Sequence, residues 1–570
     1  MERTKVEFPT VEQFFRRMFF LGLVLASLAV IGAVRVANLL LDPPPWITPP
    51  PAEEEVVLPA ERGNIYDCNG YLLSVSHTLA NIDAAPQMVT DTETLADWLA
   101  PLLWQPREKL LADLNSEAKH VRLARGVRWE VAREIFSWEM SGVTVEAWPG
   151  RVCPHDSLAA NVVGFVNDKG EAFYGVEEQY DELLSGKPGS RKSGRDPIGS
   201  LFYHVEAAHH GADLYLTLDR NVQHIVEEVL AAAVTGNEAV QGTAIVMEPQ
   251  TGAILGMAVF PTYDPNTRAV DDFGLFVNSA ISEHYEPGSV FKIVTVASGL
   301  DAGIISPAST YYDNGEIVVG GERIKNSDNQ AHGETTIRDL LAQSLNVGAA
   351  HISTMLGAFN FYEYVRRFGF NELTGVDLAE EVAGQVRFPG DREWHESDLG
   401  TNSFGQGLAV TPLQMLGAVS AVANGGVLVR PHIVDRIVDG NITTEVAPEP
   451  LRRVISPEAA AQVTEMLVYA VDTVLSTASV PGYRVAGKSG TSQIPTIAGY
   501  HPEETIASFA GYAPAYDPRF AILVVIQRPT NERWGITAAG PAFREIAERL
   551  LKLYAVPRND ARTAMRLSGG

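Results

Sequence analysis

The chain has 570 residues, of which 46% are hydrophobic and 20% charged, and its 70 acidic and 44 basic residues give a formal net charge of −26. This length predicts roughly two to four domains, and the composition excludes a wholly disordered chain and a multi-span membrane protein. The acidic balance argues against nucleic acid as a partner, because phosphate binding needs a basic surface.

The first predicted element is an apolar segment at 18–41, which is interrupted only by Arg35. Crossing a bilayer takes ~20 residues, so this segment predicts one transmembrane helix. A cleaved signal peptide is the alternative, but its apolar region usually has about 7–15 residues. After Arg35 the next basic residue is Arg62, whereas four basic residues precede the segment: Arg3, Lys5, Arg16 and Arg17. The positive-inside bias therefore predicts a cytoplasmic N-terminus.

Two zones follow a proline-rich stretch, PPPWITPPP, which predicts a stiff, extended spacer. In the first zone NIYD and YLLSVS predict strands, ETLADWLAPLLW predicts a helix, and KPGSRKSGRDPIGS predicts an exposed basic loop. The second zone begins near Asp213 with a predicted strand and amphipathic helix. Two more strands then meet at a turn at 250–252, and a strand at 521–527 and a helix at 542–554 close the zone. This order predicts a mixed α/β domain whose sheet draws on both ends of the segment.

A serine nucleophile needs a base beside it, and a lysine three positions later on a helix lies on the same face. This spacing occurs at Ser116/Lys119 and at Ser289/Lys292. The first pair lies in a polar stretch typical of solvated surface. Ser289 follows Pro-Gly at the start of an apolar helix, where free backbone N–H groups and desolvation of Lys292 favour a nucleophile–base pair. Taken alone, Ser289 is explained equally well as a helix cap.

Two further motifs follow in the chain, and each has a duplicate. Ser344-Leu345-Asn346 ends a predicted helix, whereas Ser327-Asp328-Asn329 lies in a polar, loop-like stretch. Lys488-Ser489-Gly490-Thr491 follows an apolar strand, whereas Lys192-Ser193-Gly194 lies in the basic loop. A lysine with hydroxyls suits a carboxylate, and the glycine leaves room for substrate backbone. Each motif is weak alone, but the ordered set Ser-x-x-Lys, Ser-x-Asn and Lys-Ser-Gly is specific.

With these motifs the chain resembles the penicillin-binding proteins, and among them the class B peptidoglycan transpeptidases. RGNIYDCNGYLLS and FYGVEEQYDELLSGKPG are similar to motifs of the family's non-catalytic N-terminal domain. FVNSAISEHYEPGSVFK, FGQGLAVTPLQM and SFAGYAPAYDPRFAILVVIQRP are similar to successive parts of its transpeptidase domain. The resemblance covers about residues 60 to 530 and is closest to the division-type, FtsI-like branch.

The resemblance implies a mixed α/β fold with a transpeptidase domain like those of penicillin-binding proteins and serine β-lactamases. An elongated α+β pedestal of the dimerisation type and one transmembrane helix precede it. The predicted parts are a cytoplasmic tail at 1–17, the helix at 18–41, the linker at 42–58, the pedestal at 59–212, the transpeptidase domain at 213–556 and a polar tail at 557–570.

The implied substrate is a stem peptide ending in D-Ala-D-Ala. Ser289 attacks the penultimate carbonyl with Lys292 as base, Lys488 keeps Lys292 neutral, and Ser344 relays a proton to the leaving amine. Asn346 holds a substrate amide. The carboxylate-binding segment consists of Lys488, Ser489, Gly490 and Thr491. The backbone N–H groups of Ser289 and Thr491 form the oxyanion hole. The resemblance implies no metal and no organic cofactor.

The implied partners are peptidoglycan stem peptides, β-lactam antibiotics that acylate Ser289, and the membrane. A polytopic glycan polymerase of the SEDS type and division proteins are implied as well. The implied location is the cytoplasmic membrane, with one span and the catalytic domain outside.

Two other functions remain open. A β-lactam hydrolase or sensor uses the same motifs, and a hydrolase needs a carboxylate that activates water; Glu393 and Glu396 lie between the second and third motifs. A non-catalytic scaffold needs only the anchor and pedestal, and the intact motif set argues against it. His284, near Ser289, is interpreted as a loop residue rather than as a base.

Cys68 and Cys153 are the only cysteines, too few for a disulfide scaffold or a CxxC-type metal site. Cys68 stands where the resemblance predicts arginine, and Cys153 where it predicts an aromatic residue before proline. Both lie outside the membrane, in motifs expected to pack together, so we predict a disulfide between them. Two independent buried small residues are the alternative.

Overall fold

The computed structural model describes residues 10–41, 54–195, 201–268, 270–496 and 499–558. The chain divides into two compact units. The first consists of 1–59 and 187–209, and the second of 60–186 and 210–570. We describe each unit by itself.

The first unit holds helix α1 (Val11–Leu41) and a three-stranded antiparallel sheet. Residues Val11–Leu39 form a stretch of 29 residues that is long and apolar enough to cross a membrane, by length and composition. In the sheet, β8 (Gly189–Arg195) lies between β1 (Glu54–Leu58) and β9 (Leu201–Glu206). The prediction of a loop at KPGSRKSGRDPIGS was therefore wrong over 189–195, because this segment pairs with a strand on each side.

The second unit begins with a lobe built around the long strand β3 (Leu72–Ala84), which pairs with β4 (Val121–Arg128) and β5 (Val143–Val152). Three helices complete the lobe: α2 (Thr92–Leu103), α3 (Arg107–Leu114) and α4 (Trp129–Ser137). Their buried leucines and isoleucines form a core of their own with β3 and β4. The predicted helix ETLADWLAPLLW is confirmed as α2.

The sheet of this lobe continues from β3 into the rest of the unit. Strand β10 (Asp213–Leu216) runs parallel to β2 (Ile65–Tyr66) and antiparallel to β18 (Val434–Asp439), which also pairs with β19 (Ile442–Glu445). The strand order is β19-β18-β10-β2-β3-β4. The strand that opens the second zone of the sequence therefore lies in a sheet with strands from both zones.

The central sheet of the unit is antiparallel throughout and has the order β12-β11-β23-β22-β21. Its strands are β11 (Gln241–Met247), β12 (Ile254–Phe260), β21 (Ala486–Thr496), β22 (Gly499–Ala513) and β23 (Phe520–Gln527). The prediction of a sheet drawn from both ends of the segment is confirmed.

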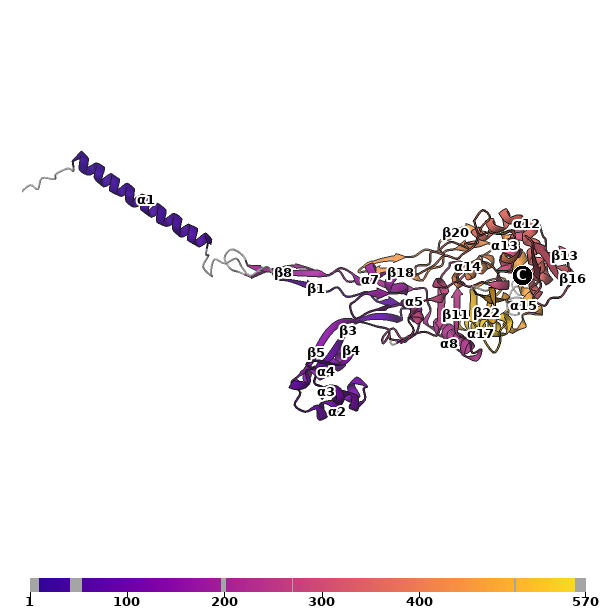
Figure 1. Cartoon of the computed structure of the whole chain (residues 1–570), viewed down its shortest axis with the longest axis horizontal. Helices are drawn as coiled ribbons and strands as arrows, with labels where there is room; N and C mark the ends of the chain where they lie inside the picture. The colour runs from indigo at the N-terminus through magenta and orange to yellow at the C-terminus, as the bar shows by residue number, and fades with distance from the viewer. Residues whose placement is uncertain (1–9, 42–53, 196–200, 269, 497–498, 559–570) are drawn as a thin grey trace, which may run out of the picture. The chain divides into compact units, whose positions relative to one another are not determined.

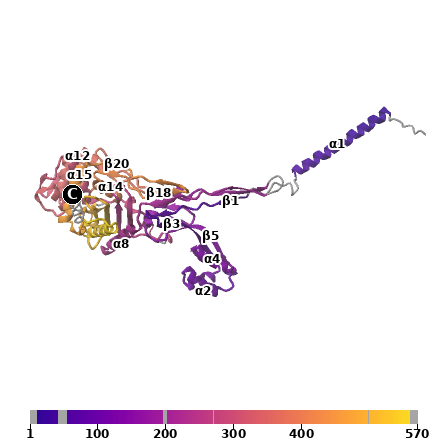
Figure 2. The same ribbon diagram turned by 180° about the vertical axis from the view of Figure 1, so that it is seen from behind.

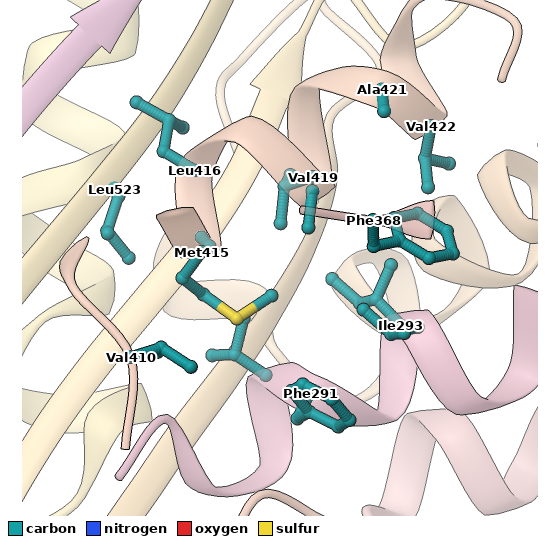
Figure 3. Packing of buried hydrophobic residues seen from close by; sticks show 14 of the residues in the cluster. Phe291, Ile293, Phe368, Val410, Met415, Leu416, Val419, Ala421, Val422 and Leu523 are labelled. Carbon is teal, nitrogen blue, oxygen red and sulfur yellow. The ribbon is translucent and has the colours of Figure 1, made fainter. Parts of the chain in front are cut away.

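Helices cover both faces of the central sheet (Figures 1 and 2). Alternate residues of a strand point to opposite faces, so Val246 packs with α8 (Arg220–Gly236) and α17 (Gly540–Leu553), whereas Ile245 belongs to the larger core. The helices of that core are α10 (Lys292–Asp301), α12 (Asn346–Arg367), α14 (Pro412–Ala423) and α15 (Pro457–Thr473). In Figure 3, Phe291 and Ile293 lie against Met415, Val419 and Phe368.

The remaining elements are short. The helices are α5 (Ala160–Val163), α6 (Gly175–Gln179), α7 (Asp181–Ser185), α9 (Ser279–Ser282), α11 (Ile337–Gln343), α13 (Glu396–Asn402) and α16 (Gly535–Ala538). The strands are β6 (Phe165–Val166), β7 (Ala172–Phe173), β13 (Thr310–Asp313), β14 (Glu316–Val319), β15 (Glu322–Lys325), β16 (Gly333–Thr336), β17 (Val427–Val429) and β20 (Pro450–Arg453).

The predicted disulfide was wrong, since Cys68 and Cys153 are both free thiols. Cys153 is buried, and its thiol is near Ser74 and Glu177. Cys68 is exposed in the turn between β2 and β3, where its neighbours are the carboxylates of Asp219, Asp67 and Asp435. The two cysteines thus have different surroundings. Burial and the nearby carboxylates raise the pKa of each thiol to about 12.

Candidate active site

Ser289 lies in a tight turn, Gly288–Phe291, that leads directly into α10, whose first residue is Lys292. The prediction of a serine at the start of an apolar helix is confirmed. Every residue of α10 from Lys292 to Leu300 is buried, so the core fixes the helix and the lysine with it. Lys292 Nζ donates a hydrogen bond of 3.1 Å to Ser289 Oγ.

The second motif reaches the same lysine from another helix. Ser344 ends α11 in the left-handed conformation, with φ of 63°, and Asn346 begins α12. This sharp change of direction turns both residues toward Lys292. Its Nζ donates to Ser344 O at 2.5 Å, to Ser344 Oγ at 3.2 Å and to Asn346 Oδ1 at 2.8 Å. The structure therefore brings Ser289, Ser344 and Asn346 together around the ε-amino group of Lys292.

The third motif lies on β21, the end strand of the central sheet. Lys488 is fully buried, and its Nζ donates to Ser489 O at 2.8 Å. Ser489 and Thr491 are half-buried, and Thr491 Oγ1 accepts a hydrogen bond of 2.9 Å from Gly535 N. Lys488 acts on the first motif electrostatically, because its charge disfavours a second charge on Lys292.

Gly490 is needed for a different reason from the one that the sequence indicated. A Cβ at this position would lie 2.5 Å from Ser508 Oγ, 2.7 Å from Pro287 O and 2.9 Å from Val290 Cγ2. The glycine therefore lets β21 pack against the turn that carries the nucleophile. Its close neighbours are protein atoms, so the prediction that it leaves room for the substrate is corrected here.

The electrostatics of the site favour a neutral base. Burial, reinforced by the charge of Lys488, lowers the pKa of Lys292 well below its usual value. Burial also lowers the pKa of Lys488, to about 7. A buried lysine of this kind is able to accept a proton near neutral pH, which a general base for a serine requires.

A cleft of about 440 Å³ opens in front of Ser289. Ser289, Asn346 and Thr491 line it together with ten residues that the sequence did not single out for the site: Gly288, Ser327, Phe404, Gln406, Gln493, Pro502, Glu503, Thr505, Arg533 and Trp534. The FGQG segment, with Phe404 and Gln406, resembled the family but carried no predicted role. For Glu503, Arg533 and Trp534 the sequence held no signal, because only the fold of β22 and the segment before α16 brings them to the cleft.

The duplicate motifs lie in different surroundings. Ser116 and Lys119 follow α3 in a partly exposed loop rather than on one helix, and Lys192 lies on β8 of the first unit. Ser327, by contrast, lines the cleft, although its motif was interpreted only as a polar loop. The reason is that Asn326 Oδ1 accepts from Val347 N at 3.1 Å, which ties this loop to the start of α12.

Three other predicted candidates are accounted for by their contacts and exposure. His284 lies in a loop, and its Nε2 is 2.6 Å from Ala383 O, as the interpretation of a loop histidine predicted. Glu393 and Glu396 are exposed, the second in the first turn of α13. Among the described residues, no group of three or more His, Cys, Asp or Glu side chains is arranged to hold a metal ion.

Comparison with known proteins identifies the family. Residues 242–548 match the model of the penicillin binding protein transpeptidase domain, and residues 57–216 match that of the penicillin-binding protein dimerisation domain. The chain belongs to the class B penicillin-binding proteins. The transpeptidase match includes all three motifs around Lys292, and the dimerisation match includes the lobe with β3.

Two named relatives cover most of this penicillin-binding protein. Stage V sporulation protein D of Bacillus subtilis is 32% identical over 520 residues, covering 88% of this chain and 79% of the relative. The peptidoglycan D,D-transpeptidase FtsI of Escherichia coli K12 is 30% identical over 510 residues, covering 86% and 83%.

Solved structures with the same fold are similar over nearly their whole length. A peptidoglycan synthetase from Bifidobacterium adolescentis has a TM-score of 0.72 and 28% identity, covering 89% of this chain and 98% of that one. Penicillin-binding protein 3 of Mycobacterium tuberculosis, solved in complex with aztreonam, has a TM-score of 0.69 and 29% identity, covering 88% and 98%.

Proposed function

We propose that this class B penicillin-binding protein is a serine-type peptidoglycan D,D-transpeptidase that cross-links stem peptides through an acyl-enzyme on Ser289. One observation carries the proposal: Lys292 Nζ lies 3.1 Å from Ser289 Oγ and 3.2 Å from Ser344 Oγ. A single buried amine between two hydroxyls is suited to take a proton from one and to pass it on through the other.

In the first half-reaction Ser289 Oγ attacks the carbonyl carbon of the penultimate D-Ala. Neutral Lys292 accepts the hydroxyl proton, and the tetrahedral oxyanion is stabilised by the backbone N–H groups of Ser289 and Thr491. The C–N bond then breaks. The proton passes from Lys292 through Ser344 Oγ to the nitrogen of the leaving D-Ala. D-Ala therefore leaves with a neutral amino group, and the acyl group remains on Ser289 as an ester.

The carboxylate of the departing residue is the natural partner of Lys488. In its protonated form Lys488 attracts this anion, and Ser489 and Thr491 donate hydroxyl hydrogen bonds to it. Because β21 is the end strand of its sheet, the donor peptide adds to it as a further strand. Gly490 keeps this strand close to the nucleophile, and Asn346 is the side chain that holds a substrate amide.

In the second half-reaction an amine of a neighbouring stem peptide attacks the ester, and Ser289 regains its proton. β-Lactams acylate Ser289 in place of the peptide, a proposal supported by the related mycobacterial protein that was solved with aztreonam. This chemistry needs neither a metal nor an organic cofactor.

We also propose the cellular setting. Helix α1 anchors the chain in the cytoplasmic membrane, with the N-terminus inside and the catalytic domain outside. The relative named FtsI supports a role in division, with a polytopic SEDS-type glycan polymerase and division proteins as partners. We propose the boundaries 18–41 for the transmembrane helix, 59–212 for the pedestal and 213–556 for the transpeptidase domain.

Labelling with a fluorescent penicillin tests the proposal. The full chain in detergent, the Ser289→Ala variant and the matched Ser116→Ala variant are labelled, and loss of the label is followed for hours. We expect stable label on the wild type and on Ser116→Ala, and none on Ser289→Ala. Label lost within minutes would favour a β-lactam hydrolase, and a wild type without label would favour a scaffold.

A further inference from the structure

Glu286 lies three residues before Ser289, outside the three motifs. The residue is only 8% exposed. Its carboxylate accepts hydrogen bonds from two segments that are distant in sequence: Oε1 accepts from Gly407 N at 3.0 Å, and both oxygens accept from Tyr500 Oη, at 3.1 and 3.2 Å. A buried carboxylate with such partners is a fixed junction between them.

Both segments contribute residues to the lining of the cleft. Gly407 ends the loop that holds Phe404 and Gln406, which line the cleft. Tyr500 pairs with Pro495 near the outer end of the β21–β22 hairpin, and the same hairpin contributes Gln493, Pro502, Glu503 and Thr505 to the lining. Glu286 therefore joins both segments to the turn that carries the nucleophile.

Two further contacts in the same region do not depend on the carboxylate. Ser492 Oγ donates to Glu286 O at 2.7 Å, and Gly288 N donates to Gly405 O at 3.0 Å. These contacts hold the inner parts of β21 and of the loop. Beyond Gln493 the register of the hairpin shifts before Pro495, so the Tyr500–Glu286 contact is the side-chain tie between the outer end and the turn with Ser289.

We propose that Glu286 is a positioning residue that sets the width of the cleft, by tying the outer end of hairpin β21–β22 through Tyr500 and the 404–407 loop through Gly407 to the nucleophile turn. The inference rests on the proposed transpeptidase function. A substrate that pairs along β21 passes this outer end, whereas a small β-lactam occupies only the space beside Ser289. The tie therefore acts mainly on the binding of extended peptide donors.

Hydrogen exchange measures the tie directly. Backbone amides of 493–505 are followed by mass spectrometry in the full chain in detergent, for the wild type, Tyr500→Phe, Glu286→Ala and Glu286→Gln. We expect about 10-fold faster exchange in Tyr500→Phe and in Glu286→Ala, because a hydrogen bond to a charged group is lost. Glu286→Gln should restore much of the protection, since its one amide oxygen still accepts from Gly407 N and Tyr500 Oη.

Tyr516→Phe is the matched control. Tyr516 Oη also donates to a carboxylate, Glu465 Oε2, at 3.1 Å, but this pair borders a separate groove with Arg338 and Tyr469. Its loss should leave exchange at 493–505 unchanged. Exchange in Tyr500→Phe equal to that of the wild type, or equally fast exchange in Tyr516→Phe, would overturn the proposal.

Kinetics separate positioning from folding. For a peptide thioester donor we expect Tyr500→Phe to raise KM about 10-fold and to leave kcat within about 2-fold. Acylation by a small penicillin should change much less. An equal loss for both ligands would also overturn the proposal. A wild type that no penicillin labels would instead refute the transpeptidase function, while the exchange data would still decide whether Glu286 ties the hairpin.

Discussion

Lys292 and Asn346 are joined by a hydrogen bond of 2.8 Å from Nζ to Oδ1, and Asn346 Nδ2 in turn donates to Lys325 O at 3.0 Å. The Asn346 amide is thus held at both ends, with its oxygen directed at the lysine. This geometry orients Lys292 between the two serine hydroxyls. It gives Asn346 a role in placing the base, in addition to the substrate contact that its motif predicts.

Replacing Asn346 by aspartate should slow acylation. A carboxylate at this distance favours the charged form of a lysine, so Asn346→Asp raises the pKa of Lys292 and leaves less neutral base at pH 7. We expect at least a ~10-fold lower rate of penicillin acylation at pH 7 and an acid limb that moves to higher pH. Stopped-flow acylation across pH checks this expectation.

Asn360→Asp is the control on the same helix, where Asn360 Nδ2 donates to Leu356 O. Its pH profile should match that of the wild type. An unchanged profile in Asn346→Asp would contradict the role of Asn346 beside the base.

The rate of acylation by a β-lactam should also fall at alkaline pH, because Lys488 loses its charge there. Burial lowers its pKa to about 7, so Lys488 is charged below this pH and neutral above it. A carboxylate-bearing β-lactam then loses affinity as pH rises through about 7, and kcat/KM reports this titration in the free enzyme. The methyl ester of the same β-lactam lacks the anion and should show a much weaker limb. Identical alkaline limbs for acid and ester would exclude Lys488 as the carboxylate partner.

Much of this site was predictable because its chemistry is local. Ser289 and Lys292 share one helical turn, and the sequence signals the ends of the elements that present Ser344 and Lys488. The contexts of the motifs also predicted different surroundings for Ser289 and Ser116, and Ser116 lies in a partly exposed loop. Short apolar runs predicted β11, β12 and β23 of the central sheet, where alternate residues such as Ile245 and Val246 belong to two cores.

The features that were not predicted from the sequence depend on contacts between residues that are distant in the chain. Ser327 lines the cleft because Asn326 bonds to the start of α12, a contact that no local pattern encodes. The β8 segment is polar and glycine-rich, and it is a strand only because β1 and β9 flank it. The disulfide prediction failed for the same reason, because motif adjacency does not determine which way Cys68 and Cys153 face.

Loss of the Glu177 charge should destabilise the region around α6, which precedes the catalytic domain. Glu177 is fully buried, and its carboxylate binds Arg62 Nε at 2.7 Å and Arg151 Nε at 2.6 Å. Glu177→Gln leaves Arg151 without an anion, whereas Arg62 keeps its ion pair with Asp181. Breaking a buried pair of this kind costs about 3–5 kcal/mol. Urea unfolding of the full chain in detergent measures the loss. Glu93→Gln, in an exposed pair with Arg107, should cost less than ~1 kcal/mol.

Glu177 also predicts how stability depends on pH. Burial acts to raise the pKa of Glu177, but the two arginines outweigh burial and hold it below its usual value. A depressed folded-state pKa means that the contribution is present above the unfolded value, ~4.3, and is lost as pH falls below it. Acid unfolding of Glu177→Gln should therefore depend less on pH than that of the wild type. A steeper dependence in the variant would contradict this assignment.

Gly490→Ala should show that Gly490 is needed for the packing of β21 rather than for contact with the substrate. The added Cβ meets Pro287 O at 2.7 Å and Ser508 Oγ at 2.5 Å, so β21 must move away from the nucleophile turn. Overpacking of this kind costs about 1–3 kcal/mol. We expect penicillin acylation to fall ~100-fold, because Thr491 N–H would move away from the proposed oxyanion position. Gly236→Ala, at the end of α8, meets no atom within 4 Å and should be neutral or stabilising by ~0.5–1 kcal/mol. Acylation of Gly490→Ala at the wild-type rate would contradict this prediction. It would mean that the close packing of β21 on the nucleophile turn does not control acylation.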